Sequence, residues 1–306
     1  MLRRAIDDYL AVRRAAGFDL GMHEVHLHSF ERFASARGDV HVRAQTAIDW
    51  AALSPLSGQQ AHRLAMVINF ARHARAEDPR HEIPPRHVFP KEVHQTRYKA
   101  FLFSKDDIVR ILDAASSLGP RGSFAPVACR ALFGLLAVTG MRISEALALR
   151  FDDVTPDGLV IRQTKFKKSR MLPLHETTEA ALESYLRRRR KIGGADDHLF
   201  VASAKKALSY EMVVVRFHRI LHQLDLHAPP GDHAPRIHDL RHSFAVHALE
   251  NCPAGDRDVV SRHMLALSTY LGHSIVSNTY MYLQLTPHLV RDVSDACEAF
   301  FKEILP

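Results

Sequence analysis

Residues 235–245 read PRIHDLRHSFA, and the short motifs YLGH at residues 270–273 and YMY at residues 280–282 follow downstream. On a helix, His238 and Arg241 share one face because they are three positions apart, so both side chains can point at one oxygen atom. Histidine, arginine and tyrosine at these intervals suit a site that handles a phosphate group. The helix that carries this stretch is therefore the element around which the rest of the chain is organised.

A second arginine lies upstream, in the segment TGMRISE at residues 139–145. Arg142 lies two residues after Gly140, which ends a strongly apolar segment, and an unpaired charge is costly to bury. Its guanidinium group either faces a phosphate or forms an ion pair with Glu145, three residues further along. This segment alone favours neither interpretation.

A basic loop follows, between two short apolar runs. Residues 159–161 read LVI, residues 171–174 read MLPL, and the loop at residues 165–170 reads KFKKSR. Apolar runs at this separation predict a β-hairpin with a cationic tip.

Taken in order, these separated segments resemble the active-site boxes of the tyrosine recombinases, also called phage-type integrases. The resemblance covers roughly residues 101–285, and its details look more like integrases carried by transposons or plasmids than like Xer-type resolvases. In that family the nucleophile lies nine residues past the Gly-His box at His273, which selects Tyr282 over its rival Tyr280.

The resemblance implies one catalytic residue at each matching position. The expected set is Arg142, Lys165, His238, Arg241, His273 and Tyr282. Counting back from the second strand of the hairpin favours Lys165, with Lys167 and Lys168 as alternatives. The two arginines would clamp phosphate oxygens, His273 would donate a further hydrogen bond, His238 would position or deprotonate the tyrosine, and the lysine would act as general acid.

The implied reaction forms a 3′-phosphotyrosine with a free 5′-hydroxyl, so strand exchange needs neither ATP nor a metal. We accordingly expect no cofactor, and the sequence has no GxxxxGK loop. Three rival functions remain: a type IB topoisomerase-like relaxing enzyme, a non-catalytic DNA-binding accessory protein, and a histidine-metal nuclease. The 21 histidines are scattered, without an HExxH motif, which favours no metal site.

The first ninety residues predict a small helical bundle. Apolar residues at helical spacing indicate helices over residues 2–16 and 23–37, a short helix capped by Thr46, and a fourth opened by Ser57. Four prolines between residues 79 and 90 then break the helical pattern. We predict a helical core-binding domain that clamps DNA at residues 1–90, a linker at 91–100 and a catalytic domain at 101–306.

The predicted fold is mainly α with a small β-hairpin or sheet. Within the catalytic domain, Ser104 with Asp107 forms an acidic variant of the capping box that opens a helix. Helices are also predicted at residues 124–138, 142–149, 177–190 and 209–224. A last helix, at residues 287–305, presents an apolar stripe near the chain end, and the resemblance suggests that it inserts into a neighbouring subunit.

The composition is typical of a soluble protein that binds a polyanion. The 306 residues carry a net charge of +7, and 46% of them are hydrophobic. The three cysteines form no CxxC pair, the N-terminus lacks the apolar core of a signal peptide, and no apolar run is long enough to span a bilayer. We expect a cytoplasmic protein that binds double-stranded DNA, as a homo-tetramer on two sites or together with sister recombinases.

Overall fold

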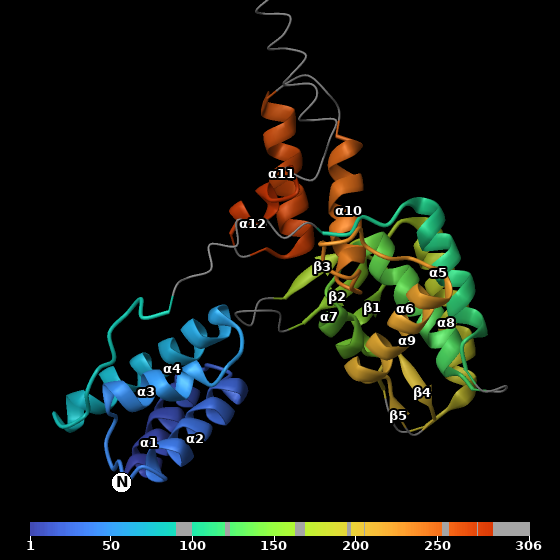
Figure 1. Cartoon of the computed structure of the whole chain (residues 1–306). Helices are drawn as coiled ribbons and strands as arrows, with labels where there is room; N and C mark the ends of the chain where they lie inside the picture. Colours follow the sequence, from blue (N-terminus) through green and yellow to red (C-terminus); the bar gives the residue numbers. More distant parts are fainter. Residues whose placement is uncertain are drawn as a thin grey trace, which may run out of the picture. The chain divides into compact units, whose positions relative to one another are not determined.

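The computed structural model describes residues 1–89, 100–119, 123–162, 169–194, 197–204, 206–252, 257–273 and 275–283. The chain divides into two compact units, Met1–Arg97 and Tyr98–Pro306 (Figure 1). Helices account for most of the described residues, and the strands are only two to four residues long. This confirms the predicted class, mainly α with small sheets.

The first unit consists of four helices packed around one apolar core. They are α1 (Leu2–Ala15), α2 (Gly21–Ser35), α3 (Ala44–Ala52) and α4 (Ser57–Glu77). Trp50 of α3 is buried against Phe30 of α2, with ring centroids 5.6 Å apart. The helical periodicity of this unit therefore follows from the need of each helix to bury one apolar face.

The predicted cap of the third helix is wrong. Helix α3 begins at Ala44, so Thr46 lies inside it and donates its hydroxyl proton to Asp39 at 2.6 Å. The N-terminal N–H group of Ala44 is satisfied instead by the carboxylate of Glu82, at 2.8 Å. A residue 38 positions away thus performs the capping that local sequence assigned to Thr46.

The second unit contains eight α-helices among the described residues. They are α5 (Lys105–Ser117), α6 (Ala125–Thr139), α7 (Ile143–Ala148), α8 (Glu176–Ile192), α9 (Tyr210–Gln223), α10 (Asp239–Glu250), α11 (Arg257–Leu271) and α12 (Ser277–Tyr280). Helix α5 begins with the predicted capping box, in which Ser104 Oγ accepts from the Asp107 N–H at 3.1 Å and Asp107 accepts from the Ser104 N–H at 3.0 Å. Helix α6 is buried along most of its length and forms the centre of the unit's larger core.

Two small sheets complete this unit. Strands β1 (Val154–Thr155), β2 (Gly158–Ile161) and β3 (Arg170–Leu172) form an antiparallel sheet, and β4 (Val201–Ser203) pairs with β5 (Lys206–Ala207). The pairing of β2 with β3 confirms the predicted hairpin and sets Ile161 opposite Arg170. This register places Arg170 at the first position of the returning strand.

A smaller apolar cluster joins α10 and α11 to the residues after α12. Its buried members are Ala245, Val246, Leu249, Met264, Leu267, Leu271 and Tyr282. Tyr282 is therefore buried in the same apolar cluster as residues of α10 and α11, the two helices labelled in Figure 1.

Two predictions concern residues outside the described part of the chain. The tail helix at residues 287–305 lies wholly outside it, and of the linker at 91–100 only Ala100 is described. Within the described ranges, no helix has both the length and the apolar composition that crossing a membrane would require.

Candidate active site

The end of α11 gathers three arginines from different parts of the second unit. Three successive backbone carbonyl oxygens, at residues 270–272, each accept a hydrogen bond from one guanidinium group. The pairs are Arg170 Nε with Tyr270 at 3.0 Å, Arg241 Nη2 with Leu271 at 2.8 Å and Arg142 Nη2 with Gly272 at 3.2 Å. Carbonyls at the C-terminus of a helix lack intrahelical partners and carry the negative end of the helix dipole. The backbone of α11 therefore assembles the cations.

Arg241 is the most deeply buried of the three, with 2% of its surface exposed. It lies in the first turn of α10, and its Nη1 donates to the carbonyl oxygen of Gly140 at 2.7 Å. Burial, followed by the positive charge of Arg142, lowers the pKa of Arg241 to about 10. The side chain stays charged at neutral pH and connects the segment around Gly140 to the end of α11.

Arg142 caps the short helix α7 and keeps 30% of its side chain exposed. Its Nη1 donates to Glu145 at 2.7 Å, so the ion pair that the sequence offered as one alternative is formed. The second guanidinium nitrogen reaches the Gly272 carbonyl at the same time. Ion pairing with Glu145 and an exposed edge that can meet a ligand therefore coexist in this residue.

Glu145 and Arg170 form an ion pair that sequence reasoning missed. Both terminal guanidinium nitrogens of Arg170 donate to Glu145, at 3.1 and 2.8 Å, and the side chains are only 12% and 7% exposed. Burial alone would raise the pKa of Glu145, but hydrogen bonds from Arg170 and Arg142 bring it down to about 2. This carboxylate therefore holds two arginines in fixed positions. In the sequence, Arg170 belongs to the predicted loop tip. Its position directly before the apolar run at residues 171–174 is the only signal that it begins a strand.

Gly272 allows this close approach. Its φ of +69° lies in the left-handed region, and a Cβ at this position would strike the guanidinium group of Arg170. A residue with a side chain would therefore strain the backbone and force the guanidinium group of Arg170 to move.

Two histidines at the start of α10, the N-cap residue His238 and His242 in the first turn, form a row that reaches the tyrosine. The ring of His238 contacts the ring of His242, with centroids 4.8 Å apart, and His242 Nδ1 lies 3.3 Å from the Tyr282 hydroxyl. Burial, with the charge of Arg241, lowers the pKa of His242 to about 4, so its ring is neutral at neutral pH. His242 was not among the predicted site residues, although it directly follows Arg241 in the sequence.

His273 stacks on the ring of the same tyrosine. Its ring lies nearly parallel to that of Tyr282, with centroids 6.1 Å apart, and its Nδ1 lies 2.8 Å from the hydroxyl of Thr279. Burial and the charges of Arg241 and Arg142 lower the pKa of His273 to about 4. If Nδ1 accepts from Thr279, the neutral ring presents Nε2–H as a donor.

The two candidate tyrosines differ sharply in environment. Tyr280 is 53% exposed, whereas Tyr282 is 1% exposed. Burial raises the pKa of Tyr282, and the charge of Arg241 with a hydrogen bond from it opposes that rise. Of the two phenols, Tyr282 is the one that lies against the arginine and the histidines.

The structure thus brings together five of the six predicted residues, namely Arg142, His238, Arg241, His273 and Tyr282. The sixth, Lys165, and its alternatives Lys167 and Lys168 lie outside the described residues.

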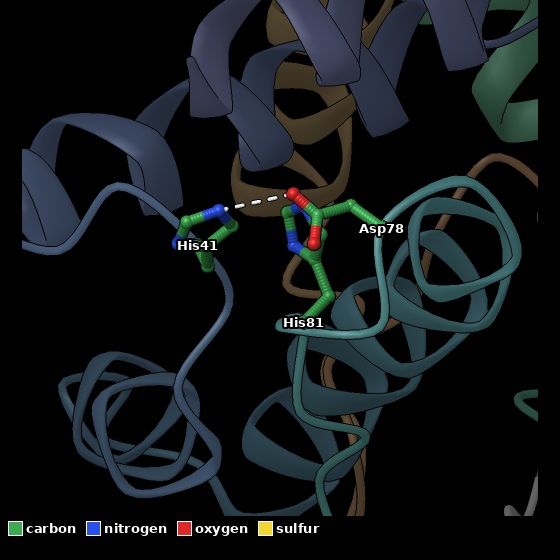
Figure 2. A group of neighbouring side chains, drawn as sticks. All are labelled: His41, Asp78 and His81. Atoms are coloured by element: carbon green, nitrogen blue, oxygen red, sulfur yellow. Dashed lines mark hydrogen bonds and ion pairs between the residues drawn. The ribbon is translucent and has the colours of Figure 1, made fainter.

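One group of three metal-ligating side chains occurs in the described part of the chain, in the first unit: His41, Asp78 and His81 (Figure 2). His81 Nδ1 accepts a hydrogen bond from the Val42 N–H at 3.0 Å, so in the neutral ring Nε2 carries the proton and has no lone pair for a metal. Asp78 accepts from His41 at 3.1 Å and from two nitrogens of Arg80. These hydrogen bonds join the loop before α3 to the end of α4.

Comparisons with known proteins place this geometry in context. Residues 102–288 match the family model described as the phage integrase family. A relative named integrase/recombinase y4rB, from Sinorhizobium fredii, is 37% identical over 301 residues, which cover 95% of each chain.

Two solved structures share the fold at low sequence identity. The XerH site-specific recombinase bound to a palindromic difH substrate, in a post-cleavage complex, has a TM-score of 0.65 at 16% identity, over 90% of this chain and 79% of that one. A lambda integrase tetramer bound to a Holliday junction has a TM-score of 0.65 at 17% identity, over 91% of this chain and 76% of that one.

Proposed function

The chain belongs to the phage integrase family and is a tyrosine recombinase, an enzyme that cleaves and rejoins DNA strands; from this premise we propose that Tyr282 is its nucleophile. The phenolic oxygen of Tyr282 attacks a backbone phosphorus atom, and the 5′-oxygen leaves. A 3′-phosphotyrosine conserves the energy of the broken bond, so the free 5′-hydroxyl of another strand can reverse the step without ATP.

One observation carries this proposal: the guanidinium groups of Arg142 and Arg241 meet at the end of α11, beside the tyrosine that contacts His242 and His273. A phosphodiester in the attacked state spreads negative charge over its non-bridging oxygens, and fixed donors around it lower the barrier. Arg142 and Arg241 supply those donors, and His273 adds another.

The remaining roles follow the family pattern. Lys165 protonates the leaving 5′-oxygen, and His238 positions the nucleophile through its contact with His242. In the conformation described, Tyr282 is too deeply buried to reach DNA. The residues that cover the Tyr282 side chain therefore have to move when the duplex binds.

The two compact units would divide the work. Residues 1–90 form the core-binding part of a DNA clamp, residues 91–100 link it to the rest, and residues 101–306 form the catalytic domain with its C-terminal exchange helix. The net charge of +7 suits double-stranded DNA as the partner. Lambda integrase was solved as a tetramer on a Holliday junction, which supports a tetramer on two sites. An assembly with sister recombinases is the alternative, and either would act in the cytoplasm.

The test compares the two tyrosines. Tyr282→Phe should abolish the covalent adduct between protein and labelled DNA, detected on a denaturing gel, while mobility-shift assays show DNA binding retained. Tyr280→Phe is the matched control, because Tyr280 lies two residues away and is exposed. It should form the adduct as the unaltered protein does. A covalent adduct formed by Tyr282→Phe would refute the assignment of the nucleophile.

A further inference from the structure

The Tyr282 hydroxyl meets a histidine that the sequence boxes did not select. Among the described residues, His242 Nδ1 lies 3.3 Å from that hydroxyl, and the two rings are 5.6 Å apart between centroids. His238, the expected partner of the nucleophile, contacts the ring of His242. His242 is therefore interposed between His238 and the tyrosine.

The other side of the His242 ring faces a carboxylate. Asp239 Oδ1 lies 4.0 Å from His242 Nε2, and Asp239 is 1% exposed and accepts the Arg236 N–H at 2.7 Å. A buried carboxylate on this side favours the tautomer with the proton on Nε2. Nδ1 then has a lone pair directed at the phenol.

The His242 ring is also kept neutral, so that it can accept a proton. His242 is 5% exposed, and burial followed by the charges of Arg241 and Arg236 lowers its pKa to about 4. A neutral imidazole that contacts a hydroxyl nucleophile, with a carboxylate near its other nitrogen, resembles the arrangement by which enzymes activate such nucleophiles. The neighbouring Arg241 favours the phenolate that forms.

We propose that His242 is a further catalytic residue, the base that takes the Tyr282 proton, in the reaction in which Tyr282 is the proposed nucleophile. As the bond from Tyr282 oxygen to phosphorus forms, the phenolic proton passes to His242 Nδ1. The bond from phosphorus to the 5′-oxygen breaks, and the 5′-oxygen takes a proton from the general acid. On rejoining, the same proton returns from His242 to the phenol.

The substitution His242→Asn tests this assignment, because the asparagine side chain can keep a hydrogen-bonding group near the position of Nδ1 but cannot take up a proton at neutral pH. The rate of covalent adduct formation should fall by about 10²–10⁴, the usual contribution of a general base. His247→Asn, the same change further along α10, is the matched control and should leave the rate unchanged. Far-UV circular dichroism and DNA mobility shifts establish that each variant folds and binds.

A modified DNA substrate distinguishes the loss of the general base from the loss of the general acid. With sulfur in place of the bridging 5′-oxygen, the leaving group needs no proton, so Lys165→Ala should recover on this substrate. His242→Asn should stay slow, because the phenol must still lose its proton. Recovery of His242→Asn on the sulfur substrate would overturn the proposal, as would an unchanged or increased rate on ordinary DNA.

Failure of this proposal is distinguishable from failure of the proposed function. If Tyr282→Phe forms no adduct but His242→Asn reacts normally, Tyr282 remains the nucleophile and only the base is wrong. If His242→Asn fails to fold, His242→Gln is assayed on both substrates with the same two expectations.

Discussion

Replacing Arg170 by methionine should cost the second unit about 2–3 kcal/mol of unfolding free energy at pH 7. Methionine keeps the unbranched apolar stem but removes the two hydrogen bonds to Glu145 and the one to the Tyr270 carbonyl. The ordinary pKa of the Glu145 carboxyl is 4.5 and the folded value is about 2, a difference worth about 3 kcal/mol. Arg142 retains part of that interaction, so the loss stays below a full disruption of the buried pair.

Urea unfolding followed by two signals measures this cost. Far-UV circular dichroism reports the helices of both units, whereas the single tryptophan, Trp50, reports only the first. Arg170→Met should shift the dichroism transition and leave the fluorescence transition in place. Arg150→Met is the matched control, because Arg150 pairs with Asp197 where both side chains are more than half exposed, and it should cost less than about 1 kcal/mol.

The pH dependence gives a second check with a fixed sign. The folded pKa of Glu145 lies below its unfolded value, so the stabilisation is complete above pH 4.5 and is lost as the pH falls toward 2. The difference between the unaltered protein and Arg170→Met should shrink over that interval. In a double-mutant cycle, adding Glu145→Gln removes the buried charge, and Arg170→Met should then cost under about 1 kcal/mol. If Arg170→Met costs no more than Arg150→Met at pH 7, the ion pair does not hold the site together.

Two further predictions concern single positions. Burial and then His41 lower the pKa of His81, so below pH 6.5 the first unit should lose stability as protons bind, and His81→Asn should weaken that dependence in unfolding followed by tryptophan fluorescence. Gly140 has φ +59°, and a Cβ there would strike the ring of Phe244. Gly140→Ala should cost about 2–4 kcal/mol in urea unfolding, against about 1–2 kcal/mol for Gly38→Ala, where the added Cβ meets nothing.

Local patterns in the sequence predicted the elements whose cause is local. The capping box at Ser104 and the helix predicted at residues 124–138 depend on residues within a few positions, and both are present. The cap of α3 depends on Glu82, far along the chain, and the prediction from Thr46 failed for that reason. Strands β1, β4 and β5 are two or three residues long, too short for an alternating pattern to show.

The site residues also divide into those that the sequence predicted and those that depend on contacts between distant segments. Family spacing named Arg142, Arg241 and His273, which the structure gathers at one place. The two residues that sequence reasoning missed act through contacts between distant segments, since Arg170 is 25 positions from Glu145 and His242 is 40 from the tyrosine. No periodicity or short motif encodes such a contact.

The backbone at the end of α11 also explains how so many cations can be held near one another. Arg142 and Arg170 both disfavour the charge on Arg241, and Glu145 is the carboxylate that bridges Arg142 to Arg170. Carbonyl dipoles at a helix C-terminus offset part of that repulsion without adding a full negative charge. The cluster therefore stays net positive and keeps its attraction for a phosphate. Because two carbonyls fix the guanidinium group of Arg241 in the absence of DNA, that donor needs little reorganisation when a phosphate arrives, which is the condition under which electrostatic stabilisation is most effective.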